Sequence, residues 1–142
     1  MAGWALAATQ AWAEVTVTEA WVRTTVPEQK ASGAYMKIRS SEDAKLVAAS
    51  SPVARTVEVH EMTMADNVMK MRAIGALALP AGQTVELKPG GYHVMLIGLV
   101  KPIERDQRVP MILTIEGKDG KRSTVKVEAT AHRPGDQAGK HK

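Results

Sequence analysis

Residues 111–129 read MILTIEGKDGKRSTVKVEA, two apolar-rich stretches on either side of a Gly-Lys-Asp-Gly turn. In the second stretch Val125, Val127 and Ala129 alternate with polar side chains. Successive side chains of a strand point to opposite faces of the sheet, so a period of two indicates a half-buried strand. Gly117 and Gly120 bracket a turn-competent cluster between the two stretches. The segment is therefore predicted to be an antiparallel hairpin.

The same pattern continues through the rest of the chain. Ala34, Met36 and Ile38 alternate with polar or amphipathic side chains. Other runs typical of strands cover residues 15–23, 45–49, 56–62, 68–72, 84–87 and 93–100. Turn-forming clusters lie at Asp66-Asn67, Pro80-Ala81-Gly82 and Pro89-Gly90-Gly91, and no segment keeps a helical period. This succession predicts an all-β antiparallel sandwich, immunoglobulin-like or cupredoxin-like, which alternation alone does not distinguish.

The chain of 142 residues has the length of one domain. Residues 1–13 carry no charge and end in Ala11-Trp12-Ala13, the small-x-small pattern of a signal-peptide cleavage site. We therefore interpret residues 1–13 as the remnant of a truncated signal peptide and residues 14–132 as the folded domain. Residues 133–142 lack apolar side chains that could offset the entropy of ordering, and this predicts a flexible tail.

Composition excludes several classes of function. The 19 basic and 15 acidic side chains are interleaved along the chain, which argues against nucleic-acid binding. No stretch approaches the ~20 apolar residues needed to span a bilayer, so we expect no membrane span in the mature chain. Cysteine is absent, which excludes disulfides, thiolate nucleophiles and the Cys-containing blue-copper site. We expect a monomer that is not an enzyme.

Methionine and histidine gather in one central window. Five of the eight methionines lie between residues 62 and 95, together with His60 and His93. Residues two apart on a strand share a face, so each of three predicted strands can present sulfur or imidazole. Val57 and Val59 take one face of their strand, which leaves His60 on the more polar face. The candidate metal ligands are His60, Met71, His93 and Met95, with Met62 and Met64 as auxiliary candidates.

These ligand types favour one ion. Thioether sulfur is a soft, neutral donor that suits Cu(I), and imidazole binds copper in either oxidation state. A site without thiolate or carboxylate offers little to a hard cation such as Mg²⁺ or Ca²⁺. Each methionine taken singly is better explained as flexible core packing than as a ligand. The combination with two histidines predicts a Cu(I) site.

The spacing His60, ten residues, Met71, twenty-one residues, His93, one residue, Met95 resembles the signature of the periplasmic copper chaperone family PCuAC, formerly a domain of unknown function. The resemblance extends from about residue 15 to residue 133 and includes the segments Ala20-Trp21-Val22-Arg23, Ala31-Ser32-Gly33-Ala34-Tyr35-Met36, Met69-Lys70-Met71-Arg72 and Gly90-Gly91-Tyr92-His93-Val94-Met95. In the family signature a methionine that is not always present directly follows the first histidine, whereas here Glu61 stands there and Met62 comes next.

The resemblance implies a cupredoxin-like sandwich that binds Cu(I) through His60, Met71, His93 and Met95 at an exposed edge. It also implies a periplasmic metallochaperone that delivers copper toward the dinuclear centre of cytochrome c oxidase. The implied partners are cytochrome c oxidase subunit 2 or a thiol-containing assembly factor of the Sco type. Some relatives bind Cu(II) in a C-terminal extension. His132 and His141 are the candidates for that role here, and we interpret them as ordinary surface histidines.

Two other functions fit parts of the pattern. A metal-free exported interaction module would use the methionines as core or as a plastic binding surface. A copper oxidoreductase would need an open coordination position and acid–base groups nearby, and only Glu58 and Glu61 are candidates. The copper carrier is the function that the sequence favours.

Overall fold

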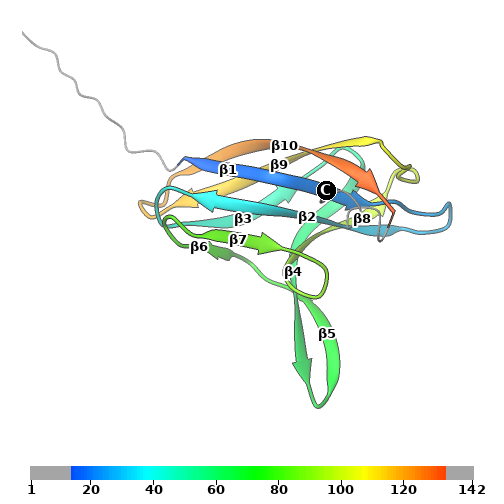
Figure 1. Ribbon diagram of the computed structural model, residues 1–142, viewed down its shortest axis with the longest axis horizontal. Coiled ribbons are helices and arrows are strands. Elements are labelled where there is room, and N and C mark those ends of the chain that lie inside the picture. Colours follow the sequence, from blue (N-terminus) through cyan, green and yellow to red (C-terminus); the bar gives the residue numbers. More distant parts are fainter. Residues whose placement is uncertain (1–13, 134–142) are drawn as a thin grey trace, which may run out of the picture.

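The computed structural model describes residues 14–133, and this part of the chain is an all-β sandwich (Figure 1). Its strands are β1 Val15–Arg23, β2 Ala31–Ser40, β3 Ala44–Ser50, β4 Ala54–Ala65, β5 Val68–Ala73, β6 Leu77–Leu79, β7 Thr84–Leu87, β8 His93–Leu99, β9 Arg108–Gly117 and β10 Arg122–His132. Within the described residues no helix is long and apolar enough to cross a membrane.

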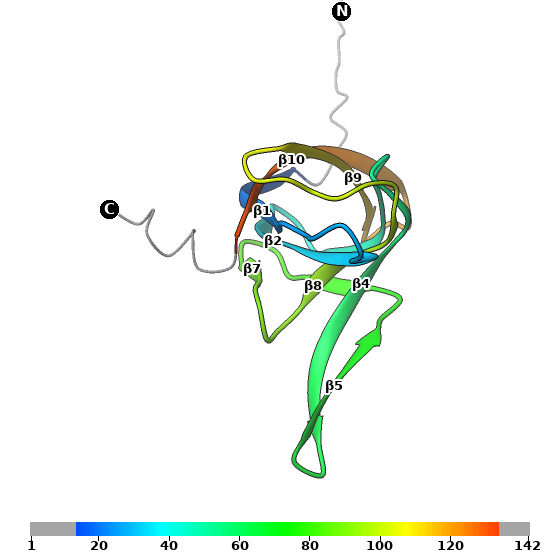
Figure 2. The same cartoon turned by 90° about the vertical axis from the view of Figure 1, so that its right-hand side faces the viewer.

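The strands form one continuous ladder in the order β5-β4-β8-β2-β1-β10-β9-β3-β6. Strand β7 pairs with β2 beyond the point where β8 ends, so that β8 and β7 cover successive halves of β2. The β9–β10 hairpin predicted from residues 111–129 is present, with Val125 opposite Leu113. Viewed from the side in Figure 2, β9 and β10 lie on one side of the core and β2 and β8 on the other.

The inward side chains of both layers form a single core. Among them are five fully buried side chains, Val22, Ile38, Val94, Leu96 and Leu113. Their sequence neighbours point outward because strand side chains alternate. Strands β1, β2, β4 and β8 therefore have an outer face whose side chains are free to form a site.

A β-bulge in β1 changes which residues reach this outer face. Thr18 pairs with Lys37 and Trp21 pairs with Tyr35, so two residues of β1, Glu19 and Ala20, lie opposite one residue of β2. Glu19 has a positive φ of 54°. The extra residue reverses the alternation. As a result Val22 enters the core, while Trp21 lies on the outer face beside Tyr35.

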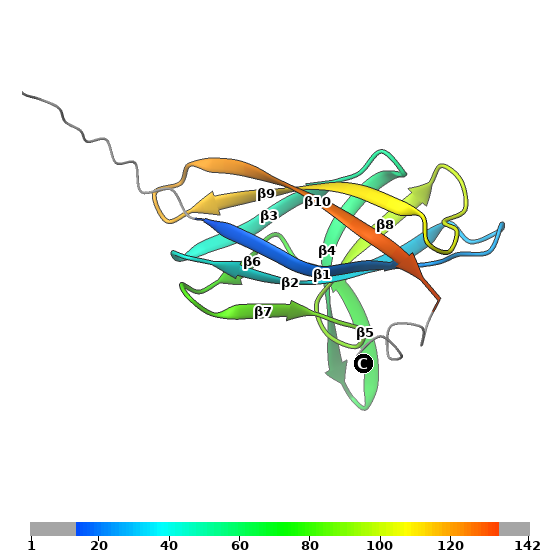
Figure 3. The same ribbon diagram turned by 45° about the horizontal axis from the view of Figure 1, so that its top comes forward.

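The β4–β5 hairpin extends away from the sandwich, as Figures 1 and 3 show. Its turn consists of Asp66 and Asn67, with φ of 52° and 63°. Two consecutive positive φ values are typical of the type I′ turn, whose twist matches that of the flanking strands. The turn predicted at Asp66-Asn67 is thus confirmed, and it fixes the register of every pair along the hairpin.

Two features of the fold differ from the sequence prediction. Strand β6 was not predicted, because its three residues are too few to show an alternating pattern. The predicted antiparallel sandwich also contains one parallel pairing, between β1 and β10, with Trp21 opposite Thr130. Alternation along a strand carries no information about the direction of its partner.

Candidate metal centre

Three neighbouring strands bring the predicted histidines together. On the outer face His60 of β4 pairs directly with His93 of β8, and their ring centroids are 5.7 Å apart. Met95, two residues after His93, lies on the same face opposite Gly33 of β2. Val59 and Val94, the neighbours of the two histidines, are in the core. The core thus fixes the direction in which both imidazoles point.

His93 is held from the loop that precedes it. This loop, residues 88–92, leaves the sheet where β7 ends, and the His93 Nδ1 atom lies 3.2 Å from the Gly91 carbonyl oxygen. A carbonyl oxygen can only accept a hydrogen bond, so in a neutral ring Nδ1 donates and Nε2 keeps its lone pair. Nε2 lies 3.0 Å from the Met71 sulfur. Two lone-pair donors from different strands therefore converge on one point.

The charge state of His93 suits a metal ligand. Burial lowers the pKa of His93 below its ordinary value, and electrostatic interactions with His60 and Arg23 add to this effect, whereas the hydrogen bond to Gly91 acts in the opposite direction. The side chain is only 5% exposed. Near neutral pH the ring is therefore neutral, which is the form that binds metals.

His60 is oriented by an acidic neighbour on its own strand. Its Nε2 atom lies 2.8 Å from Oε1 of Glu58, two residues earlier on the same face. The carboxylate can only accept, so Nε2 donates and Nδ1 of the neutral ring keeps its lone pair. This Nδ1 atom is buried and has no hydrogen-bond partner among the described residues. Buried polar atoms are rarely left without a partner, so the unpaired Nδ1 indicates a missing ligand.

A cavity of about 280 Å³ lies over His93, but His60 does not line it. Three of the four predicted ligands line it, Met71, His93 and Met95, and so does the auxiliary candidate Met62. Gly33 also lines it, and a Cβ atom there would lie 2.7 Å from the Tyr35 hydroxyl oxygen. A glycine at this position therefore allows the tyrosine ring to lie against the site.

Aromatic side chains lie next to His93 on the outer face. Tyr35 lies between Trp21 and His93, with ring centroids 4.8 Å and 6.2 Å away. The Arg23 guanidinium lies 5.5 Å from the Tyr35 ring centroid. Burial raises the pKa of Tyr35, so the phenol stays protonated. Trp21 and Tyr35, 7% and 6% exposed, thus pack against each other on the outer face.

The remaining candidate residues lie farther out. Met64 does not line the cavity, is 63% exposed and pairs with Met69 toward the tip of the hairpin. His132 is the last residue of β10, and its ring centroid lies 6.2 Å from that of Trp21. His141 and the predicted tail from residue 134 onward, like the predicted signal remnant 1–13, lie outside the described residues.

Sequence reasoning missed the role of two residues. Glu58 was considered only as a possible acid–base group, although its position two residues before His60 on one strand face could have identified it as a hydrogen-bond partner. The importance of Gly33 depends on the side-chain conformation of Tyr35, whose ring lies over the position that a Cβ atom of residue 33 would take. No local sequence signal contains that information.

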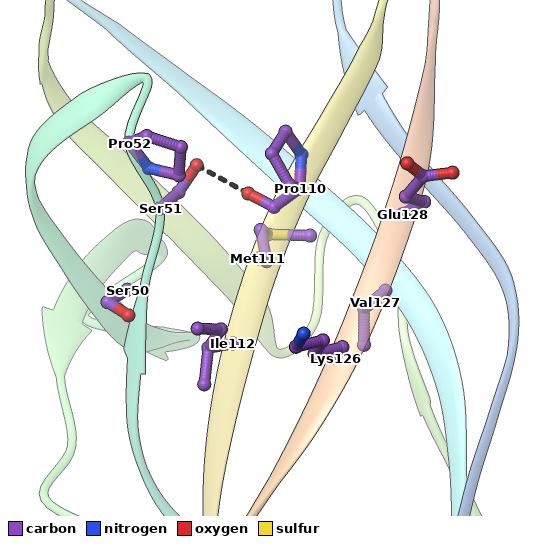
Figure 4. Close-up of a pocket in the computed structure, with 9 residues that line it drawn as sticks. All are labelled: Ser50, Ser51, Pro52, Pro110, Met111, Ile112, Lys126, Val127 and Glu128. Carbon is purple, nitrogen blue, oxygen red and sulfur yellow. Dashed lines mark hydrogen bonds between the residues drawn. The ribbon is translucent and has the colours of Figure 1, made fainter.

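The rest of the described chain offers no competing metal site. Residues 14–133 contain no group of three or more His, Asp or Glu side chains arranged to hold a metal ion. A larger cavity of about 750 Å³ lies across β3, β9 and β10 (Figure 4). It has no imidazole, and its one sulfur atom belongs to Met111, which is 1% exposed. Within residues 14–133, the larger cavity thus lacks the combination of imidazole and accessible sulfur that His60, Met71, His93 and Met95 offer.

Comparison with known sequences gives two matches. A family model described as "Putative lipoprotein LpqE-like" matches residues 15–130. A protein of Leifsonia xyli subsp. xyli named "Putative lipoprotein Lxx21020" is 36% identical over 93 residues, a match that covers 65% of this chain and 55% of the relative. The chain thus spans about half the length of the curated relative that it matches.

Solved structures share the fold. The apo form of DR1885 from Deinococcus radiodurans is 30% identical with a TM-score of 0.59, and the match covers 93% of this chain and 90% of that one. Its Cu(I) form is 32% identical with a TM-score of 0.58, covering 80% and 75%. The copper-bound PCuAC domain of PmoF2 is 24% identical with a TM-score of 0.66, covering 84% and 93%, and at that identity the likeness concerns the fold alone. The predicted cupredoxin-like fold class is confirmed.

Proposed function

The chain belongs to the LpqE-like lipoprotein family, and from this premise we propose that it is an exported copper carrier that binds Cu(I) and passes it to another protein. The proposed ligands are Nδ1 of His60, Nε2 of His93 and the sulfur atoms of Met71 and Met95. One observation supports this set most strongly. His93 Nε2 faces the Met71 sulfur at 3.0 Å, while the buried Nδ1 of the adjacent His60 lacks a partner among the described residues.

The donor set favours Cu(I) over other ions. Two thioethers and two neutral imidazoles form a soft site without formal charge, which suits a monovalent soft cation better than Zn²⁺ or Cu(II). Glu58 stands behind His60, and it acts as a hydrogen-bond acceptor that raises the basicity of the ring. The solved Cu(I) form of DR1885 is consistent with this choice.

Exposure of the site favours transfer over storage. Met71 is 46% exposed, so one ligand is accessible to an incoming acceptor, whereas His93 is 5% exposed. Neutral ligands need not take up protons when the metal leaves, in contrast to thiolates. A partner could therefore replace the methionines one at a time.

Export is supported by the lipoprotein family and by the signal-like residues 1–13. We propose the periplasm as the compartment and the dinuclear copper centre of cytochrome c oxidase subunit 2 as the destination. Delivery is direct or by way of a Sco-type thiol protein. Cysteine is absent from this chain, so the thiols of such a partner would draw Cu(I) from the weaker thioethers.

The proposal is tested by metal selectivity and transfer. The chain is dialysed separately against Cu(I) under anaerobic conditions, Cu(II) and Zn(II), and the Cu(I)-loaded form is then mixed with an apo acceptor domain that carries the dinuclear copper site. We expect retention of one Cu(I), little Zn(II), and movement of copper to the acceptor without oxygen consumption. Preference for Zn(II), or copper-dependent oxygen consumption above the free-ion background, would contradict a Cu(I) carrier.

A metal-free interaction module is the second candidate, and one observation favours it. Several large apolar side chains are exposed on the β4–β5 hairpin, namely Met64, Val68, Met69 and Met71. Exposed apolar surface often marks a protein-binding site. Replacement of methionine by leucine separates the two functions, because leucine preserves apolar contact and removes the sulfur.

A further inference from the structure

The β4–β5 hairpin carries two facing rows of methionine side chains that extend outward from the proposed site. Met62 pairs with Met71 and Met64 pairs with Met69, and the register places all four on the face that carries His60. Directly opposed residues of an antiparallel pair have Cβ atoms ~5 Å apart. Successive pairs on one face are ~6.7 Å apart along the strand, two residues of rise. Flexible thioethers can bridge these distances.

The opposite face of the hairpin is polar. There Glu61 forms an ion pair with Arg72 at 2.7 Å, and the Thr63 hydroxyl donates a hydrogen bond to the Lys70 carbonyl oxygen at 3.5 Å. Carboxylate and ammonium groups are thus kept away from the sulfur face. The ion pair, the hydrogen bond and the turn stabilise the hairpin without involving the sulfur atoms, and Val68 and Ala65 also lie on this opposite face.

Burial supports the same conclusion. Met64 is 63% exposed and Met69 is 47% exposed, and neither belongs to the core cluster. The hairpin stands clear of the sandwich in Figures 1 and 2, so no other described element covers these side chains. Methionine that fills a core cannot account for them. Their distinguishing property is an accessible soft donor atom.

We propose that Met64 and Met69 form a second, weaker Cu(I) site, the outer site, at the tip of the β4–β5 hairpin. Through it the ion enters and leaves the site formed by His60, Met71, His93 and Met95, the inner site. The inference rests on the proposed function and extends it. Cu(I) keeps its oxidation state throughout, and each step exchanges one thioether for the next without proton release. Two thioethers without imidazole bind Cu(I) more weakly than the two thioethers and two imidazoles of the inner site. Copper affinity therefore increases toward the inner site, as loading from the outside requires.

The experiment follows the methionine methyl groups of the full chain by NMR, with methyl-¹³C methionine and anaerobic Cu(I). We expect the methyl signals of Met71 and Met95 to shift with the first equivalent, and those of Met64 and Met69 to shift with the second. In Met64→Leu/Met69→Leu the shifts of Met71 and Met95 should be retained, the chain should bind one equivalent of Cu(I) instead of two, and withdrawal of copper by a chelator should be slower. The control Thr63→Leu/Lys70→Leu alters the facing pair on the polar side and should keep both responses.

The outcomes separate this inference from the proposed function. If excess Cu(I) moves Met71 and Met95 but leaves Met64 and Met69 unchanged, the outer site is refuted and the inner site stands. If no methionine responds, both are refuted. A partner that binds Met64→Leu/Met69→Leu as well as the wild type, with unchanged copper withdrawal, would make this face a docking surface instead and would overturn the outer site.

Discussion

Glu58 determines which nitrogen of His60 keeps its lone pair. Its carboxylate accepts from Nε2 at 2.8 Å, and this leaves Nδ1 as the available donor. For Glu58→Ala we expect Cu(I) affinity to fall by roughly 10–100-fold, the usual effect of removing the hydrogen-bond partner of a metal-binding histidine. Anaerobic competition with a chromogenic chelator measures the change.

Glu61→Ala is the matched control for this prediction. Glu61 lies on the same strand and is also ion-paired, but its partner is Arg72 on the opposite face. Its loss should leave the affinity unchanged. Equal effects of the two substitutions would show that general negative charge matters, and not the orientation of His60.

Gly33 keeps the space that the ring of Tyr35 occupies. A Cβ atom would lie 2.7 Å from the tyrosine oxygen, and the ring is confined by Trp21 and His93. Gly33→Ala should therefore cost about 1–3 kcal/mol in unfolding free energy, as overpacking does, and it should lower copper affinity through His93. Thermal unfolding and chelator competition measure the two effects.

Addition of Tyr35→Phe supplies the internal test of Gly33→Ala. Removal of the hydroxyl relieves the closest contact, so the double variant should recover part of the lost stability and affinity. A Gly33→Ala protein indistinguishable from wild type, or a double variant with no recovery, would contradict the assigned contact.

At the scale of the element, the turn of the β4–β5 hairpin controls the position of Met71. Asn67 has φ of 63°, a conformation that β-branched residues avoid. Asn67→Val should destabilise the hairpin by about 1–2 kcal/mol, the cost of the left-handed conformation. Amide exchange should accelerate in β4 beyond His60 and in β5, with unchanged core protection, and Cu(I) affinity should fall. Asn67→Gly is the control and should preserve hairpin stability, amide exchange and Cu(I) affinity. Faster exchange throughout the sandwich in Asn67→Val would contradict a local effect.

Elements were predictable from the sequence where alternation is long and regular. Strands β2 and β10 show it, and the turn at Asp66-Asn67 has the residue types that positive φ favours. Strand β6 is too short to show a pattern. The bulge at Glu19 was hidden because only the pairing with β2 reveals the extra residue, and it is this bulge that places Trp21 beside Tyr35.

The site was predictable to a similar extent. Shared strand faces and residue types indicate His60, Met71, His93 and Met95, and the fold brings them together because β4 lies between β5 and β8. The direction in which each imidazole nitrogen points depends on Glu58 and the Gly91 carbonyl. These are contacts of atoms, and residue spacing does not specify them.

For the whole molecule, core and site lie on opposite faces of the same strands. Met71 is 46% exposed and outside the core cluster, so its replacement should not unfold the apo protein. We expect Met71→Leu to keep the melting temperature of the apo form. Copper should stabilise the wild type by about 2.7 kcal/mol when free Cu(I) is a hundredfold above Kd, and Met71→Leu much less. Anaerobic calorimetry measures both, and equal copper stabilisation of the two proteins would contradict a ligand role for Met71.

The central claim is that one Cu(I) ion binds to His60, Met71, His93 and Met95. Its most direct test is an anaerobic titration of the chain with Cu(I) in competition with a chromogenic chelator, for wild type and for Met71→Leu/Met95→Leu. We expect one tightly bound equivalent in the wild type and its loss in a variant that remains folded. A wild type that fails to compete with the chelator, or a folded variant with unchanged affinity, would contradict it.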